Sequence, residues 1–152
     1  MANPFPFVAG QVLTAAQMNG IGEYAAYTPT FTALTVGNGT LDWRFGRVQN
    51  FIHVEGKLLF GSTTSVSGNV LFTLPATARS AVNNMQIGVS RLTDAGVSTI
   101  FGLVIQASTT TAAIQAFAAG FTYLTNSAFS ATDPFTWNVN DEIYVNCVYE
   151  AA

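Results

Sequence analysis

Apolar and polar side chains alternate along residues 40–60, and this alternation constrains the fold more than any other feature of the chain. In TLDWRFGRV, Leu41, Trp43 and Phe45 fall on one face of an extended strand, and charged residues occupy the positions between them. NFIHVEGKLLF repeats the pattern with a second set of inward apolar residues. Successive side chains of a β-strand point to opposite faces, so this period of two predicts half-buried strands.

Short apolar runs separated by turn residues continue to the end of the chain, namely GNVLFTLP, MQIGVSRL, VSTIFGLVIQAS, AAIQAFAAGFTYL and DEIYVNCVYE. We expect a hairpin turn at Gly37–Gly39 and a second turn at Asp94–Gly96, because Asn, Asp and Gly accept turn geometry. Regular turn signals favour antiparallel strands over βαβ units. The sequence therefore predicts an all-β fold of about nine strands, an antiparallel jelly-roll-like β-sandwich.

The first 28 residues follow a different pattern. Thr14 and Gln17 form a capping box that predicts a helix of about two turns, which the glycines at 20 and 22 end. A helix this short is not stable alone in water, so it must dock on something. We predict an extended and helical attachment segment over residues 1–28 and a β-sandwich head over 29–152. The apolar side chains available for attachment are Phe5, Phe7, Val8, Val12, Leu13 and Met18.

Charge is sparse in this chain. Charged residues make up 9% of it, against about a quarter in typical globular domains, while apolar residues make up 49%. The stretch TIFGLVI is apolar on both faces, and Tyr144 and Val148 lie on the face opposite Ile143. Antiparallel strands that are apolar on both faces need a cover on each. We expect copies of the same chain, in a homotrimer with closed symmetry, to supply it.

Composition also excludes several partners and compartments. No apolar run reaches the 18 residues that a membrane span needs, and the N-terminus lacks the pattern of a signal peptide. The net charge is −3 and the five cations are spread along the chain, which argues against nucleic-acid binding. We therefore expect neither a membrane nor a nucleic acid as a partner.

No motif predicts catalysis. Cys147, the single cysteine, lies in an alternating strand and is expected to be buried and inert. His53, the single histidine, shares a polar strand face with Glu55 and Lys57, too few ligands for a metal. The sequence GIGEYA matches the residue pattern of a dinucleotide-binding motif, but it lacks the preceding strand and the following helix that this motif requires. We therefore expect no catalytic residue, no cofactor and no metal, and a protein that is not an enzyme.

One stretch between 120 and 138 combines aromatic and polar residues in the manner of a sugar site. Tyr123 or Trp137 would supply a stacking face, and Asp133 would accept hydrogen bonds from hydroxyl groups. The competing interpretation is that these rings pack in the core around a turn at Pro134. Both interpretations remain open from the sequence.

Two segments taken together resemble a known group of proteins. PFVAGQVLTAAQMNGI, followed by YTPTFTALTVGNGTLDWRFGRVQNFIHVEGKLLFGSTTSVSGNVLFTLP, is similar to minor tail and tail-fibre proteins of tailed bacteriophages. The resemblance covers residues 5–75, while 76–152 match only in style. It implies a virion protein made in the bacterial cytoplasm, commonly trimeric, that attaches to other virion proteins and binds the host, for instance through a surface glycan.

Two alternatives accompany this expectation. A capsid decoration or head-fibre protein would suit the same trimeric β-fold. A hydrolase acting on cell-wall glycans would need carboxylates from distant strands, and its candidates are Asp133, Asp141 and Glu142. The adjacent pair Asp141 and Glu142 points to opposite faces of a strand, so the two cannot form a glycosidase pair by themselves.

Overall fold

The computed structural model describes residues 9–10, 12, 14–15, 21–79, 85–120 and 123–152, with the backbone alone at 118–120, 123–126 and 128. Within these ranges the chain is all-β, as the alternation predicts. The strands are β1 (Tyr24–Ala26), β2 (Phe31–Thr35), β3 (Thr40–Val48), β4 (Phe51–Leu59), β5 (Ser65–Thr73), β6 (Met85–Asp94), β7 (Ser98–Gln106), β8 (Thr111–Gly120), β9 (Tyr123–Ala128) and β10 (Glu142–Glu150).

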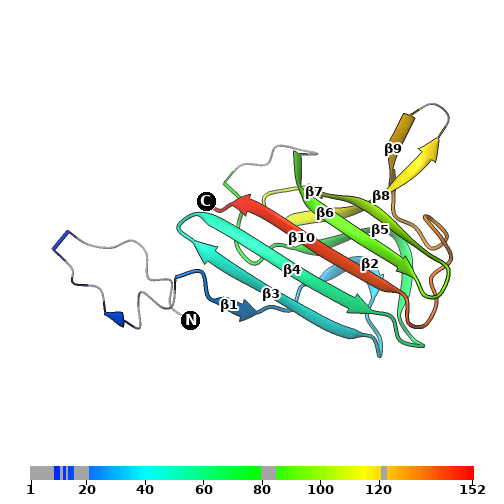
Figure 1. Ribbon diagram of the computed structural model, residues 1–152, viewed down its shortest axis with the longest axis horizontal. Coiled ribbons are helices and arrows are strands. Elements are labelled where there is room, and N and C mark those ends of the chain that lie inside the picture. The colour runs from blue at the N-terminus through cyan, green and yellow to red at the C-terminus, as the bar shows by residue number, and fades with distance from the viewer. Residues whose placement is uncertain (1–8, 11, 13, 16–20, 80–84, 121–122) are drawn as a thin grey trace.

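All of these strands belong to one antiparallel sheet (Figure 1). Its order is β1-β3-β4-β10-β6-β7-β8-β5-β2, and β9 pairs with β8 beside this path. The last strand of the chain, β10, lies in the middle of the sheet and pairs with β4 on one side and β6 on the other. The predicted jelly-roll sandwich is not confirmed, because the described strands form one continuous sheet.

The sheet curls so that its two ends face each other across a gap that the core fills. Trp43 on β3 contacts Phe72 on β5 and Phe31 on β2, with ring centroids 5.0 and 5.6 Å apart. The segment between β1 and β2 crosses this gap, since the Tyr27 amide donates to the Trp43 carbonyl and the Thr30 carbonyl accepts from the Thr73 amide. The core therefore lies inside a half-barrel of strands.

The predicted faces of β3 and β4 are confirmed. Trp43, Ile52, Val54 and Leu58 are buried in the core, together with Phe60 just after β4. The polar residues between them point to the opposite side of the sheet, which is open to solvent. Burial of the apolar face on the core thus sets the orientation of both strands.

The turn at Gly37–Gly39 is not a hairpin turn, because β2 pairs with β5 while β3 pairs with β4 and β1. Gly37 has a φ of 56°, and the side chain of Asn38 bonds to Ser62 and Thr63. The turn is a corner that carries the chain from one end of the curled sheet to the other. The prediction fails because turn residues define a bend and not the strands that pair around it.

The turn predicted at Asp94–Gly96 is confirmed, and it joins a hairpin. β6 and β7 pair along their length, and Gly96 has a φ of 78°. The run AAIQAFAAGFTYL, expected as one strand, spans β8 and the start of β9, which pair with each other. Figure 1 shows this β8–β9 hairpin extending beyond the rest of the sheet.

The N-terminal segment is described only in part. The helix predicted after Thr14 falls mainly on residues outside the described ranges, as do five attachment residues, Phe5, Phe7, Val8, Leu13 and Met18. Val12 is described and exposed. The last part of the segment belongs to the sheet, because β1 pairs with β3 from Tyr24 to Ala26.

Candidate functional site

The side of β3, β4, β10, β6 and β7 that faces away from the core carries two parallel rows of side chains, and we call this side the outer face. Neighbouring residues in each row are cross-strand partners, so the register of the sheet places them side by side. The first row is Asp42, Lys57, Tyr144, Arg91 and Phe101. The second row is Arg44, Glu55, Asn146 and Val89.

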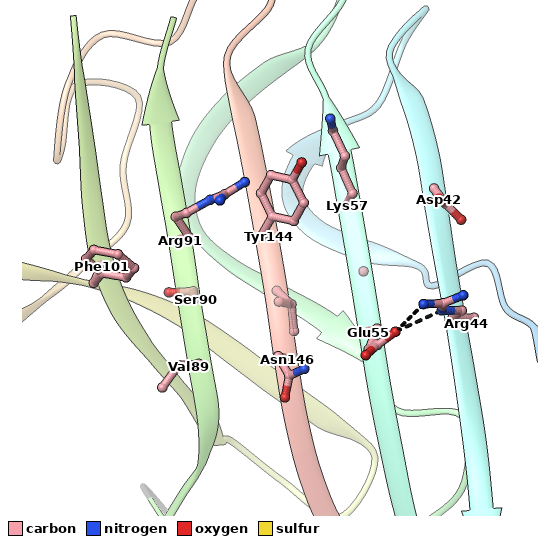
Figure 2. A pocket seen from close by; sticks show the side chains of 12 residues that line it. Asp42, Arg44, Glu55, Lys57, Val89, Ser90, Arg91, Phe101, Tyr144 and Asn146 are labelled. Carbon is pink, nitrogen blue, oxygen red and sulfur yellow. Dashed lines mark hydrogen bonds and ion pairs between the residues drawn. The ribbon is translucent and has the colours of Figure 1, made fainter. Parts of the chain in front are cut away.

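A groove of about 550 Å³ is lined by both rows (Figure 2). Its lining also includes Gly56, Val145 and Ser90, which lie one position along their strands between the rows. The side chains of Val145 and Ser90 are buried on the core side, so these residues present mainly backbone to the groove. The groove therefore crosses the strands, with a backbone floor and side-chain walls.

Ion pairs connect the charged groups of the outer face. Arg44 binds Glu55 at 2.7 Å, and Lys57 binds Glu142 at 2.5 Å. Hydrogen bonding to the carboxylate raises the pKa of each cation above its ordinary value. Arg91 lies 3.8 Å from the second oxygen of Glu142. Both cations in these pairs stay charged across the physiological range.

Tyr144 lies at the centre of the first row between two cations. The guanidinium carbon of Arg91 is 3.8 Å from the centroid of the Tyr144 ring, and the Lys57 nitrogen is 5.1 Å from it. Both distances suit cation–π contact. Figure 2 shows the Tyr144 ring between Arg91 and Lys57 on the outer face.

A smaller hollow of about 200 Å³ lies beyond the second row, and Tyr24, Val48, Phe51 and Val148 contribute apolar side chains to it. His53 connects the hollow to the groove. Its Nδ1 bonds to the Tyr24 hydroxyl and its Nε2 lies 3.2 Å from Asn146 Oδ1. Strand β1 is thus attached to the outer face through side chains as well as through its backbone.

The predicted sugar-binding residues lie away from this groove, and none of them lines it. Trp137 packs among three rings, with centroids 4.8 Å from Phe60, 4.7 Å from Phe129 and 4.5 Å from Phe135. Its Nε1 donates to the Ser130 carbonyl at 3.2 Å. These contacts agree with the interpretation in which the rings pack together, because they occupy much of the indole surface.

The other two predicted sugar residues lie in a turn and at the start of β9. Asp133 lies in a turn where its carbonyl accepts from the Ser130 amide and its amide donates to the Ser130 hydroxyl. Tyr123 begins β9, and its side chain is not described. A glycan site between 120 and 138 stays a prediction.

The carboxylates considered for hydrolysis do not converge in the described structure. Asp141 is buried and accepts hydrogen bonds from the amides of Ala95 and Asn138, so it holds two turns together. Glu142 lies on the outer face with Lys57. No group of three or more potential metal ligands is present among the described residues. In the same part of the chain, no helix has the length and apolar character of a membrane span.

The gathering of charge on the outer face is not predicted from the sequence. Three of the five cations, Arg44, Lys57 and Arg91, line one groove although they are spread along the chain. Each occupies an outward position of an alternating strand, which is the signal available in the sequence. The missing information is that β10 lies between β4 and β6.

No protein-family model, curated protein or solved structure matches this chain.

Proposed function

We propose that this chain is a structural protein of a tailed-bacteriophage particle, the head of a tail or tail-fibre protein that contributes to host attachment. The resemblance of residues 5–75 to tail proteins supports the virion context. The observation that carries the proposal is the outer face, where large apolar side chains such as Phe101 and Phe51 are exposed beside charged groups that pair with one another. Such a face is typical of a subunit that functions inside an assembly.

In this proposal the chain assembles as a homotrimer. The N-terminal segment attaches the head to a neighbouring virion protein, and the ends of the strands furthest from that segment are available to the host. A trimer presents three copies of any weak binding site, and this multiplies the apparent affinity for a repetitive surface glycan. The residues between 120 and 138 remain the predicted place for that contact.

Immunogold electron microscopy tests the proposal directly. Antibodies raised against the recombinant chain are applied to purified particles whose genome encodes it. Gold at the tail or its fibres supports the proposal. Gold on the capsid surface would instead support a decoration or head-fibre protein, and particles without label would refute a virion role.

A second measurement addresses attachment. Host cells incubated with the recombinant protein should adsorb fewer particles, because the free protein occupies the same receptors. Unchanged adsorption at saturating protein would contradict a role in host binding.

A further inference from the structure

The exposed apolar side chains of this protein are concentrated on one side. Among the described residues, six of the ten large apolar side chains that are exposed lie on the outer face or in the hollow beside it. They are Tyr24, Val48, Phe51, Val89, Phe101 and Val148. Val89 and Phe101, of which Phe101 is 63% exposed, lie at the β6–β7 end of the charged rows, and the other four lie in the hollow beyond the second row. Concentrations of exposed apolar surface of this kind mark interaction sites.

The charges between these groups balance. Three cations, Arg44, Lys57 and Arg91, accompany three carboxylates, Asp42, Glu55 and Glu142. A face with no net charge does not repel a copy of itself. The mixed signs also let charged groups on one copy meet opposite charges on a neighbouring copy, which the symmetry of the assembly rotates relative to the first. Because its charges balance, the outer face has no net electrostatic attraction for a strongly acidic or strongly basic partner.

The outer face is large enough for a stable contact. Five strands, each about 4.8 Å wide and about 30 Å long, cover roughly 700 Å². Stable protein–protein interfaces bury about 800 Å² on each partner. Side chains that project from the sheet increase its surface area beyond this flat estimate, so one such face can bury about 800 Å². The groove between the rows gives room for side chains of the partner to enter.

We propose that the outer face of β3, β4, β10, β6 and β7 binds a second copy of this chain. This assignment rests on the proposed homotrimer, in which the outer faces of the copies turn toward the symmetry axis, and it adds the surface through which neighbouring copies touch. Phe101 and Val89 anchor one end of the contact, and the hollow around Phe51 and Val148 anchors the other. The paired charges and Tyr144 occupy the middle and fix the relative orientation of the copies.

Two matched variants of the full chain test the assignment. Phe101→Lys places a charge on the outer face, whereas Val97→Lys places one at the tip of the β6–β7 hairpin, where Val97 is 78% exposed. Native mass spectrometry and sedimentation velocity give the mass of each. We expect the parent protein and Val97→Lys to form the same oligomer. Phe101→Lys should dissociate to the 16.1 kDa monomer, with association weakened roughly 30-fold or more.

Circular dichroism confirms that each variant is folded, and Val89→Lys provides a second substitution on the same face. A parent protein that is monomeric at micromolar concentration would overturn the assignment. An oligomer that survives both outer-face substitutions would overturn it as well. These masses are measured without particles, so they are independent of the immunogold result. Tail labelling with a monomeric protein would refute the interface and leave the virion role standing.

Discussion

Replacing Gly56 by alanine tests how the core is packed behind the outer face. Gly56 on β4 lies opposite Trp43 on β3, and a Cβ at position 56 would lie 2.2 Å from the nearest indole atom. Ordinary contact begins near 3.4 Å, so the indole would have to move by roughly 1 Å. It has little freedom to do so, because Trp43 is 4% exposed and its neighbours include the rings of Tyr27, Phe31 and Phe72.

We expect Gly56→Ala to lower the free energy of unfolding by about 1–3 kcal/mol, the usual cost of overpacking a core. For a domain of this size, each kcal/mol lowers the melting temperature by about 2–4 °C. Chemical denaturation followed by tryptophan fluorescence measures the change, and scanning calorimetry gives the melting temperature. The same substitution in a Trp43→Val background should cost less, because the ring that blocks the Cβ is absent.

Gly68→Ala is the matched control. Gly68 also lies in a strand, but an added Cβ there would meet only the Cβ of Ala33 at 3.6 Å. Alanine restricts the unfolded chain more than glycine does, so this variant should gain about 0.4–1 kcal/mol. If Gly56→Ala were as stable as Gly68→Ala, or if its cost persisted without the indole, the clash with Trp43 would not be the reason.

Three further predictions concern stability and assembly. Trp137→Ala should lower the free energy of unfolding by about 3 kcal/mol in chemical denaturation, because three aromatic rings lose their partner; weaker host adsorption by a variant of unchanged stability would instead support the sugar site. Burial raises the pKa of Cys147 to about 12, so iodoacetamide should label the native protein at pH 8 far more slowly than the unfolded one. The unfolded chain releases this proton near pH 9, while the folded chain keeps it. Stability should therefore fall as the pH rises above about 9, and less so in Cys147→Ala; Tyr149, whose pKa burial also raises, adds to the loss at higher pH. Deleting residues 1–20 should leave a folded β-rich head by circular dichroism that no longer incorporates into particles, and a deletion variant that fails to fold would contradict the attachment role.

Local patterns predict which faces of individual strands are buried. Alternation predicts the burial of Trp43 and Leu58 and the exposure of the charges between them, because the period of a strand is a property of the backbone. It also predicts that Tyr144 and Val148 oppose Ile143, as the structure confirms. These expectations need only two adjacent residues to point in opposite directions.

The alternation of side chains within a strand does not predict which distant strands pair with each other. The turn at Gly37–Gly39 has hairpin residues, yet its strands pair elsewhere, because the curl of the sheet brings β2 to β5. The groove depends on the same long-range order. Lys57 and Arg91 meet Tyr144 only because β10 lies between β4 and β6, and no local pattern records that position.

The central place of β10 has a consequence for the synthesis of the protein. Strands β4 and β6 leave the ribosome before β10. Until β10 is present, each of them has one edge without a pairing strand, and unpaired edges are the condition under which chains associate wrongly. The sheet closes only after residues 142–150 have been translated, so we expect β4 and β6 to complete their pairing only when β10 has left the ribosome. A stop codon just before residue 142 would remove the middle of the sheet, not its rim.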